Sequence, residues 1–563
     1  LQRQEGEGLS HRDVSGVWVL RELARCKGEP MATMPVVFTS VLGLPNDASL
    51  DLSPTFPRQV YALTQTPQVW LDAKVSESRD CLVLDWDGVD ELFAPGVLDD
   101  MFAAYVGLVR RLADEHWAHP VLLAPPAAHQ EIRHDVNSTV HVWPDTRPLY
   151  LRFFAQAEQT PAAPALICAD RMIDYQTLAD QALRVAGYLA AYGIKPGDRV
   201  AITHAKGADQ VVAVLGVLAA GGCYVPSGID LPMARREIVY GSAGVRLVLT
   251  DDVSRERLDW PVATPVVPLS VALGGPALPA AVVQPPEAIK YIIFTSGSTG
   301  VPKGVEVSHA AVANTIDAVD RLFAIRPEDR TIALSALDFD LSAYDLFAFL
   351  SLGASVVMIS EAERRDAAAW VTLINRWEVT VISAVPALVE MITIAADRVG
   401  LPAGLRLVMV GGDRVVRSLP DGLWRRAPQA RFAALGGMTE AAIHSTCHEV
   451  TRQDPQWACA PYGRPLANMR CRVVDGFGRD CPNWVKGELW VSGAGVAQGY
   501  HGDAARTQEK FVERDGGRWY RTGDVARYHP AGILEFLGRA DNQVKIRGHR
   551  IELAEVEGAL VGH

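Results

Sequence analysis

The sequence predicts an α/β protein with large layers built on partly parallel sheets. Short apolar runs such as Leu247–Thr250, Val356–Ile359 and Val379–Ile382 recur along the chain and alternate with segments of helical periodicity. Strands separated by helices favour parallel pairing, because a parallel connection needs a crossover long enough to hold a helix. With 563 residues the chain is too long for one hydrophobic core, so we expect two to four domains.

The composition argues against several classes of partner. Lys and Arg total 54 against 66 Asp and Glu, giving a net charge of −12 without a dense basic run, so we expect no nucleic acid and no membrane as partner. The most apolar segment, Val211–Val225, is shorter than the ~20 residues of a membrane span. Gly221 and Gly222 also interrupt it. Small solutes remain as candidate partners.

The cysteines and the first residue bear on compartment and completeness. The eight cysteines contain no Cys-x-x-Cys pair, which argues against a zinc site and against a disulfide framework. No signal peptide is visible near Leu1, so we expect a reducing, cytoplasmic setting. Because the sequence does not begin with methionine, we expect it to be cut from a longer protein.

Residues 1–123 are predicted to form a unit of their own. Its strand signals are Met34–Ser40 and Gln65–Asp72, which are rich in β-branched and aromatic residues. From spacing alone, Thr39 fits an ordinary strand threonine and Asp72 a strand-end cap.

The next domain follows a predicted linker. Residues 124–149 turn to Pro, His, Asn and Asp without periodicity, as is typical of a linker. In residues 150–538, an apolar-periodic helix is expected from Tyr175 to Gly193, and a turn then leads into the strand Arg199–Thr203.

A phosphate-binding loop is the strongest functional signal. Tyr291–Phe294 suits a short buried strand, and a loop of hydroxyl residues and glycines follows, closed by Lys303. Glycine permits the φ > 0 turns that wrap an anion, and hydroxyls and an ammonium donate to phosphate. The alternative is a solvated Ser/Gly turn before a helix, which the adjacent apolar strand and Pro-Lys-Gly disfavour. The Gly-Lys-Ser/Thr of a mononucleotide P-loop occurs nowhere in the chain. The expected phosphate ligands are Thr295, Ser296, Gly297, Ser298, Thr299, Gly300 and Lys303.

The string Thr-Ser-Gly-Ser-Thr-Gly-x-Pro-Lys-Gly resembles the phosphate loop of the adenylate-forming superfamily, which includes adenylation domains of nonribosomal peptide synthetases, acyl-CoA ligases and luciferases. Three later strings extend the resemblance. Gly437–Glu440 matches the motif that places a threonine near the α-phosphate and a glutamate on magnesium. Tyr520–Asp524 matches the aspartate that accepts the ribose hydroxyls, and Gly538–Lys545 matches the hinge before a small C-terminal subdomain.

This resemblance implies the adenylate-forming fold, with a large core in residues 150–538 and the hinge and start of the small subdomain in residues 539–563. It also implies ATP and Mg²⁺ as cofactors. Two departures stand out: Gly436 and Met438 replace an aromatic residue and a proline, so adenine must stack elsewhere, and the second catalytic lysine lies beyond His563. The implied residues are Lys303, Thr439 and Glu440 for catalysis, Glu440 for the metal, Ala434, Gly436, Thr439, Asp524 and Arg539 for the nucleotide, and Asp541 for the hinge.

The strings in residues 1–123, together with Trp86-Asp87 and Met101–Tyr105, resemble the C-terminal lobe of a heterocyclization domain. That family condenses a carrier-bound acyl group with Cys, Ser or Thr and dehydrates the amide to a thiazoline or oxazoline. The resemblance implies a chloramphenicol-acetyltransferase-like α/β lobe, with Thr39 and Asp72 serving cyclodehydration by acid–base chemistry. The Asp-rich motif of the N-terminal lobe is missing from this sequence. The implied partners are peptidyl carrier domains upstream and downstream, each bearing phosphopantetheine.

Specificity is expected in Phe339–Tyr344, where Asp340 resembles the residue that pairs with the substrate's α-ammonium group. The alternative for Asp340 is a helix N-cap. We expect Gly411 to leave room for one extra methyl group and His444 to hydrogen-bond oxygen, which favours a serine-like acid such as α-methylserine. Leu341 and Tyr344 make cysteine the principal competitor. The implied pocket comprises Asp340, Leu341, Tyr344, Ser383, Met409, Gly411, Leu435, Ile443 and His444.

Two further functions are compatible with parts of this pattern. One is a stand-alone acyl-CoA or aryl-acid ligase whose N-terminal unit is an interaction module, which the strings around Thr39 and Asp72 and the presence of Asp340 disfavour. The other is a scaffold that binds nucleotide without chemistry, which the presence of Lys303, Glu440 and Asp524 disfavours.

Overall fold

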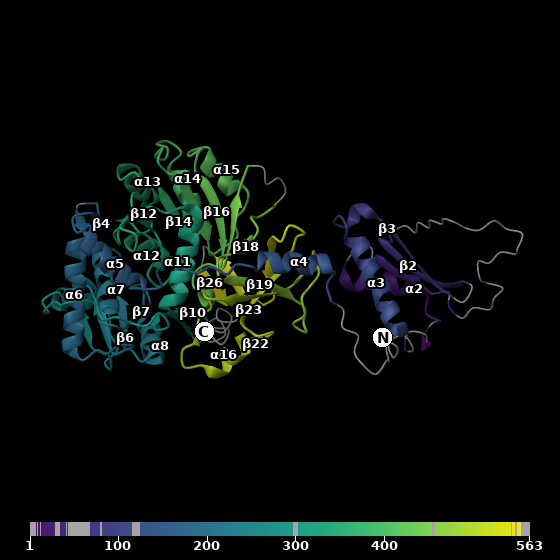
Figure 1. The fold of residues 1–563 in the computed structure, drawn as a ribbon, viewed down its shortest axis with the longest axis horizontal. Coiled ribbons are helices and arrows are strands. Elements are labelled where there is room, and N and C mark those ends of the chain that lie inside the picture. Colours follow the sequence, from purple (N-terminus) through teal and green to yellow (C-terminus); the bar gives the residue numbers. More distant parts are fainter. Residues whose placement is uncertain are drawn as a thin grey trace, which may run out of the picture. The chain divides into compact units, whose positions relative to one another are not determined.

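The computed structural model divides into two compact units, Leu1–Pro126 and Ala127–His563 (Figure 1). In the part of the chain that is described, every helix falls short of the length and apolar character needed to cross a membrane. The described residues are 7, 10, 11, 13–28, 34–40, 42, 68–78, 81–114, 124–169, 171–296, 302–452, 457–541, 543–546 and 549–552.

The first unit is a three-stranded sheet with helices. β1 runs parallel to β2, and β2 pairs antiparallel with β3. Trp86 of β3 stacks on Tyr105 and meets the edge of Phe102, both at 5.4 Å between ring centroids, which fastens α3 to the sheet. The elements are α2 (Gly16–Lys27), β1 (Val36–Ser40), β2 (Leu71–Ser78), β3 (Cys81–Gly88), η2 (Asp90–Leu92) and α3 (Val97–Asp114).

The strand expected at Gln65–Asp72 is wrong at residues 68–70, because β2 begins only at Leu71. Leu71, Ala73 and Val75 are buried at alternate positions, which is the period of a strand with one covered face. Only the first of these three positions lies in the expected segment, and the other two follow it. Residues 65–67 lie outside the described part of the chain.

The linker expected at residues 124–149 is also wrong in part, because it contains the helix α4 (Ala127–Val136) and ends where α5 begins at Leu149. The Arg133 guanidinium donates to Asn483 Oδ1 at 2.8 Å and to the Cys481 carbonyl at 2.9 Å, and it lies 4.5 Å from the Tyr528 ring centroid. These partners are more than 340 positions away in sequence. Local composition therefore carries no sign of them.

Two large sheets form the body of the second unit, and the strands from β10 to β9 in the first and from β16 to β4 in the second are parallel. The first has the order β21 (Gly499–Tyr500), β11 (Lys303–Ser308), β10 (Ile289–Thr295), β7 (Cys223–Pro226), β6 (Arg199–Thr203), β8 (Leu247–Thr250) and β9 (Val266–Pro268). The second has the order β18 (Arg464–Pro465), β17 (Thr446–Val450), β16 (Arg431–Gly436), β15 (Leu407–Gly411), β14 (Val381–Ala384), β12 (Arg330–Ala333), β13 (Ser355–Met358), β4 (Pro164–Ile167) and β5 (Met172–Asp174). The predicted α/β class with partly parallel sheets is confirmed.

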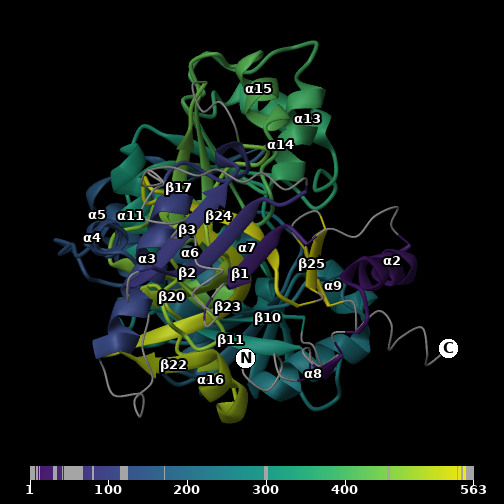
Figure 2. The ribbon, with the colours of Figure 1, turned by 90° about the vertical axis from the view of Figure 1, so that its right-hand side faces the viewer.

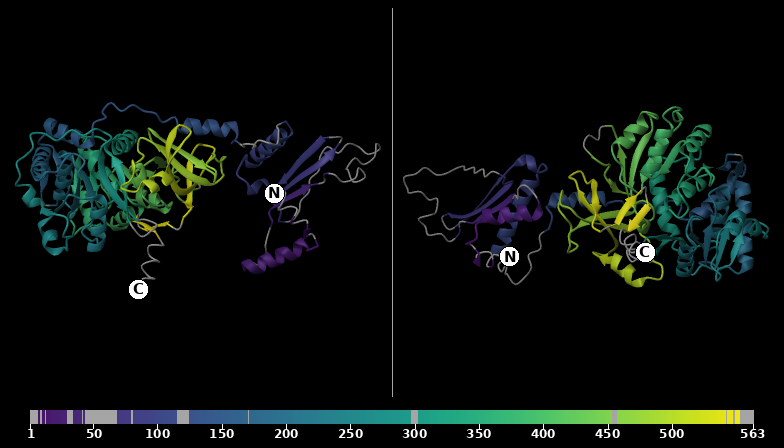
Figure 3. Two further views of the ribbon diagram at one scale, coloured as in Figure 1. Left: turned by 90° about the horizontal axis from the view of Figure 1, so that it is seen from below. Right: turned by 180° about the vertical axis from the view of Figure 1, so that it is seen from behind.

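A third sheet is antiparallel and lies in the yellow-green and yellow part of the chain (Figure 3). It contains β19 (Met469–Val474), β20 (Gly487–Gly493), β23 (Gly517–Tyr528) and β22 (Phe511–Arg514), and β24 (Leu534–Arg539) pairs with β23. The pair β25 (Gln543–Ile546) and β26 (His549–Glu552) follows the predicted hinge.

Helices cover the sheets, and the start of one of them, α12, contributes to the site described below. The predicted helix at Tyr175 is confirmed as α6 (Tyr175–Tyr192), which ends at Gly193 in the left-handed conformation. α13 (Ala367–Arg376), α14 (Pro386–Ala395) and α15 (Ser418–Trp424) lie together beside the nine-stranded sheet (Figures 1 and 2). The others are α5 (Leu149–Gln159), α7 (Ala208–Ala219), α8 (Met233–Ala243), α9 (Asp252–Arg257), α10 (Leu269–Ala272), α11 (His309–Phe323), α12 (Leu341–Leu350), α16 (Ala504–Lys510) and the turn η3 (Thr439–Ala441).

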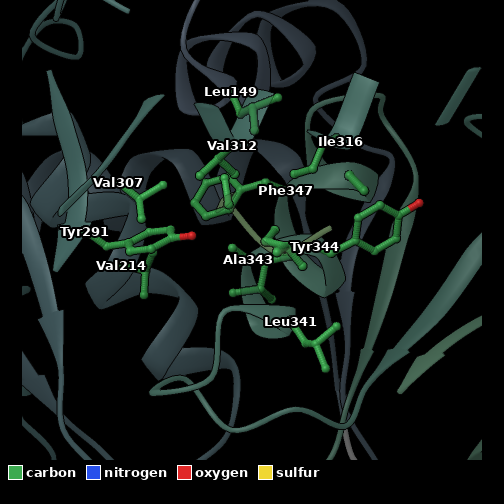
Figure 4. Packing of buried hydrophobic residues seen from close by; sticks show 14 of the residues in the cluster. Leu149, Val214, Tyr291, Val307, Val312, Ile316, Leu341, Ala343, Tyr344 and Phe347 are labelled. Atoms are coloured by element: carbon green, nitrogen blue, oxygen red, sulfur yellow. The ribbon is translucent and has the colours of Figure 1, made fainter. Parts of the chain in front are cut away.

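The buried core joins the first sheet to α11 and α12. Tyr291 and Val307 of the sheet pack in one cluster with Val312 of α11 and Phe347 of α12 (Figure 4). All ten residues of α12 are buried. This packing fixes the start of α12, which carries Asp340, close to the end of β10, which leads into the predicted phosphate loop.

Candidate functional site

A cavity of about 220 Å³ lies where β10, the start of α12 and the loop after β16 meet. The strands β14, β15 and β16 end near it, and the carboxyl ends of parallel strands are the usual ligand-binding edge of such a sheet. The lining residues are Ile293, Phe294, Thr295, Ser296, Asp338, Phe339, Asp340, Leu341, Gly412, Gly437, Met438, Thr439, Ile443 and His444.

The predicted phosphate loop connects β10 to β11, two antiparallel strands in which Thr295 pairs with Lys303. A Cβ at Gly304 would lie 2.8 Å from Ile292 and 2.9 Å from Phe294, so this position requires glycine. The Thr295 hydroxyl is buried in the cavity wall and has no hydrogen-bond partner among the described residues, which fits a group that receives a ligand. Gly297, Ser298, Thr299 and Gly300 lie outside the described residues.

Lys303 and Glu440 form a buried ion pair, with 3.0 Å between Nζ and Oε1. Tyr500 completes a cluster with them, because its hydroxyl donates to the same Glu440 oxygen at 3.0 Å and accepts from Lys303 Nζ at 3.3 Å. Glu440 is fully buried, so a cation beside it is energetically required. Tyr500 was missed by the sequence reasoning, since only the pairing of β21 with β11 brings it here.

Glu440 fits the predicted magnesium role in its chemistry. Among the described residues no group of three or more His, Cys, Asp or Glu side chains could hold a metal. Mg²⁺ is commonly bound through one or two carboxylates, with water and substrate phosphates as its other ligands. The ammonium of Lys303 already neutralises this carboxylate, which marks the position as one that accepts positive charge.

Asp524 and Arg539 are in contact, as expected if both bind the same nucleotide. Arg539 Nη1 donates to Asp524 Oδ1 at 2.7 Å, and its Nε donates to Asp541 Oδ1 at 2.9 Å. Burial lowers the pKa of Arg539, but the two carboxylates outweigh this effect and raise it overall. The predicted ribose carboxylate and the predicted hinge are therefore joined through one guanidinium.

Tyr462 explains why Gly436 departs from the aromatic residue expected there. A Cβ at Gly436 would lie 2.9 Å from the Tyr462 ring and 2.4 Å from Thr446 Oγ1, so the ring occupies that space. The Tyr462 hydroxyl donates to Asp524 Oδ2 at 3.1 Å, and its ring stacks on Phe536 at 5.0 Å and 14°. Ala434, also predicted to bind nucleotide, is buried inside the nine-stranded sheet and does not line the cavity.

Asp340 lines the cavity and is 8% exposed. It occupies the N-cap position of α12, but it has helical backbone angles and its side chain makes no capping hydrogen bond. The capping alternative is therefore unsupported, since a cap acts through that bond.

The predicted specificity residues divide into two sets. Asp340, Leu341, Ile443 and His444 line the cavity, whereas Tyr344, Ser383, Met409, Gly411 and Leu435 do not. Tyr344 is buried, and its hydroxyl donates to Asp320 of α11 at 2.9 Å. Ser383 and Met409 are register neighbours in β14 and β15 and are each 1% exposed.

The space expected beside Gly411 is filled, and that expectation is wrong. A Cβ at Gly411 would lie 2.7 Å from His444 Cε1 and 3.3 Å from its Nδ1. The imidazole ring therefore occupies the volume that glycine leaves free. A small residue at one position and a large ring 33 positions later form a single packing unit.

His444 is the polar group of the cavity with the clearest demand for a ligand. It is 1% exposed, and neither ring nitrogen has a hydrogen-bond partner among the described residues. Burial lowers its pKa to about 3, so the ring is neutral near pH 7, with one donor and one acceptor nitrogen. Ala442 and Ile443 before it have φ of 48° and 76°, which is strained for a β-branched residue such as isoleucine.

In the first unit, Thr39 and Asp72 lie on the neighbouring strands β1 and β2. The Thr39 hydroxyl donates to Asp72 Oδ1 at 3.2 Å, and Lys74 Nζ lies 3.7 Å from Asp72 Oδ2. Lys74 also pairs with Asp87 of β3. The arrangement holds the Asp72 carboxylate between a hydroxyl and an ammonium, which suits a group that moves protons.

Comparison with known proteins gives a consistent result. Residues 153–501 match the family of AMP-binding enzymes. Phenyloxazoline synthase MbtB of Mycobacterium tuberculosis is 45% identical over 568 residues, which cover 100% of this chain and 40% of MbtB. Pyochelin synthetase PchE of Pseudomonas aeruginosa is 45% identical over 562 residues, covering 100% of this chain and 38% of PchE. The chain thus spans about two fifths of the length of these relatives.

Solved structures of a nonribosomal peptide synthetase, FmoA3, resemble this chain. One is 39% identical with a TM-score of 0.89 and covers 96% of this chain and 58% of the other. The form with AMPPNP bound has a TM-score of 0.88 at 39% identity, and covers 95% and 58%. The form with α-methyl-L-serine-AMP bound has a TM-score of 0.86 at 39% identity, and covers 93% and 60%.

Proposed function

Because this chain belongs to the AMP-binding enzymes, a family of ATP-dependent adenylating ligases, we propose that it activates an amino acid with a β-hydroxyl or β-thiol and loads it on a carrier protein. It has the adenylate-forming fold of nonribosomal peptide synthetase adenylation domains. The observation that carries the proposal is that one cavity holds both kinds of group needed. Thr295, Ser296 and Thr439 supply hydroxyls for phosphate, and Asp340 and His444 supply partners for an amino acid.

The proposed chemistry is an in-line displacement. An oxygen of the amino-acid carboxylate attacks the α-phosphorus of ATP. The bond between this phosphorus and the oxygen that bridges the α- and β-phosphates breaks, and pyrophosphate leaves. Lys303 neutralises charge that spreads over the phosphate oxygens, and the Thr295 hydroxyl donates to them. Mg²⁺, held by Glu440, would supply further neutralisation when bound. The phosphopantetheine thiol then attacks the acyl carbon, and AMP leaves.

Asp340 is proposed to recognise the α-ammonium group. Asp340 places a buried carboxylate in the cavity wall, and a carboxylate forms a charge-assisted hydrogen bond with an ammonium group, so an amino acid is favoured over a fatty or aryl acid. Asp340→Asn should reduce amino-acid activation by a few kcal/mol of transition-state binding. Asp338→Asn, which removes another carboxylate of the same cavity wall, serves as the matched control and should cost less.

His444 is proposed to recognise the substrate's β-substituent. A neutral imidazole whose two nitrogens have no hydrogen-bond partner among the described residues suits a hydroxyl, which can donate and accept, better than a thiol, which does both weakly. This favours serine-like acids, including α-methylserine, over cysteine. The similarity to FmoA3 with α-methyl-L-serine-AMP bound and to a synthase named for an oxazoline supports the oxygen series.

The substrate test is amino-acid-dependent pyrophosphate exchange in the full-length protein. Serine, α-methylserine, threonine, cysteine and the des-amino acid 3-hydroxypropionate would be compared at equal concentration. Preference for a β-hydroxy amino acid is the expected result. Preference for cysteine would refute the role of His444, and equal activation of 3-hydroxypropionate and serine would refute the role of Asp340.

For the two ends of the chain we propose the assignments that the sequence predicts. Residues 1–123 would be the C-terminal lobe of a heterocyclization domain that uses Thr39 and Asp72, acting with carrier domains on either side. Residues 539–563 would begin the mobile subdomain, which turns at Asp541 between the two half-reactions. The hydrogen bond from Thr39 to Asp72 supports the first assignment, and the link from Arg539 to Asp541 supports the second.

A further inference from the structure

Tyr500 places its hydroxyl between the two charged groups of the proposed phosphate site. Lys303 Nζ lies 3.0 Å from Glu440 Oε1, the Tyr500 hydroxyl lies 3.0 Å from that same oxygen, and Nζ lies 3.3 Å from the hydroxyl. The donors are consistent around this triangle, because Lys303 donates to both oxygens and Tyr500 donates to Glu440. The ammonium also lies 4.7 Å from the Tyr500 ring centroid, which adds a cation–π contact.

The backbone fixes Tyr500 in this place. It belongs to β21, the edge strand that pairs with β11, so it lies beside the strand that begins with Lys303. Its amide donates to Thr507 Oγ1 at 3.0 Å, and its ring meets Phe511 edge-on at 5.6 Å. The side chain is 4% exposed. The Tyr520 hydroxyl lies 3.5 Å from the Tyr500 hydroxyl, which is therefore held among Lys303, Glu440 and Tyr520.

The proposed reaction requires the ion pair to separate. Lys303 must reach phosphate oxygens while Glu440 binds the metal, so the cation beside the buried carboxylate changes during nucleotide binding. A carboxylate left without its ammonium in a fully buried place needs a second, permanent donor. Tyr500 supplies such a donor from a strand that carries neither charged group.

We propose that Tyr500 is a positioning residue, which holds the Glu440 carboxylate in place while its cation changes from Lys303 to the metal that accompanies ATP. This inference rests on the proposed function of Glu440 and Lys303. Tyr500 touches neither reacting atom in this role. It lowers the cost of exchanging one cation for another at a buried carboxylate.

The test compares Tyr500→Phe with the native full-length protein, using AMPPNP binding by calorimetry with and without Mg²⁺. The variant keeps the ring and removes only the bridging oxygen. Loss of a hydrogen bond to a charged group should weaken Mg²⁺-dependent AMPPNP binding about tenfold. Metal-free AMPPNP binding and the KM for the amino acid should change less than about twofold. Tyr528→Phe is the matched control, since it removes a buried hydroxyl that donates to the Cys471 carbonyl at 2.9 Å.

Two results would overturn the proposal. One is unchanged Mg²⁺-dependent binding in Tyr500→Phe, and the other is an equal loss with and without metal, which would indicate a general structural role. If Tyr500→Phe does not fold, 3-fluorotyrosine at position 500 keeps the shape and strengthens the donor. A shift in metal-dependent binding then supports the proposal, and none overturns it. Nucleotide binding is measured without amino acid, so failure here is distinct from failure of the substrate assignment.

Discussion

Substitution of Gly411 by alanine tests the coupling between this glycine and His444. The new Cβ would lie 2.7 Å from His444 Cε1 and 3.1 Å from the Leu435 carbonyl oxygen. An ordinary contact begins near 3.4 Å, so the imidazole must retreat by about 0.7 Å, the difference between 3.4 and 2.7 Å. Overpacking of this kind costs roughly 1–3 kcal/mol of unfolding free energy. The backbone φ of Gly411 is not positive, so the cost is steric.

Denaturant unfolding and pyrophosphate exchange would measure the two consequences separately. Gly411→Ala should lower the unfolding free energy by that amount, and it should raise the KM for the amino acid, because the displaced ring would lose the hydrogen bond to the substrate that we propose for it. Gly422→Ala is the matched control, since a Cβ there would have its nearest neighbour at 3.7 Å.

A double variant decides whether His444 is the cause. Removal of the ring in His444→Ala makes room for the new methyl group, so the cost of Gly411→Ala should vanish in that background. The interaction energy of the cycle should then be about 1–3 kcal/mol. If Gly411→Ala costs the same with and without the ring, the coupling is refuted. If Gly411→Ala leaves stability unchanged and impairs activation of α-methylserine more than that of serine, the original expectation of an empty gap is restored.

Three further predictions follow from the charges. Burial lowers the pKa of His444 to about 3, so below pH 6.5 the unfolded chain binds a proton that the native chain does not. The free energy of unfolding should therefore fall as the pH falls from 6.5 towards 3. His444→Gln should remove about 2 kcal/mol of the loss between pH 6.5 and 5, measured by unfolding at both pH values. Lys290 is 1% exposed, and its Nζ has no hydrogen-bond partner among the described residues. Lys290→Met should therefore raise the free energy of unfolding by about 1–3 kcal/mol, whereas Lys195→Met, at an exposed position, should not. A lower melting temperature for Lys290→Met would contradict this prediction. Asp72→Asn in the full synthetase should accumulate uncyclized amide on the carrier, seen by mass spectrometry, while adenylation continues; undiminished ring formation would remove Asp72 from the mechanism.

Much of the fold could be predicted because it is written in local patterns. The helix from Tyr175 to Gly193 shows apolar periodicity and a glycine stop, and the strand Arg199–Thr203 follows a turn signal. α4 shows no such pattern. Its residue Arg133 is buried only because Asn483 and the Cys481 carbonyl accept its hydrogen bonds, and those partners come from the far end of the chain. From local composition alone, residues 124–149 are a polar segment, which predicts a linker.

The residues of the candidate site also divide into those with a local sequence signal and those without one. Lys303, Glu440 and Asp524 could be found because each lies in a contiguous string. Tyr500 and Tyr462 could not, because each reaches the site through strand pairing or ring packing between segments distant in sequence. Both stand next to residues that were predicted, and both donate a hydroxyl to a predicted carboxylate. The strings therefore identify the charged groups, and the supporting donors emerge only from the fold.

The cavity shows why residue identities at single positions mislead. Taken separately, Gly411 indicates free volume and His444 indicates a polar group. Together they predict a substrate with an additional substituent. In the structure the two statements describe the same space, since the ring fills what the glycine leaves. The ring can stand there only because the left-handed turn at Ala442 and Ile443 turns the chain just before it. The proposed recognition of the β-substituent therefore depends on the position of one neutral imidazole, and we expect a change at Gly411 to act on specificity by moving that ring.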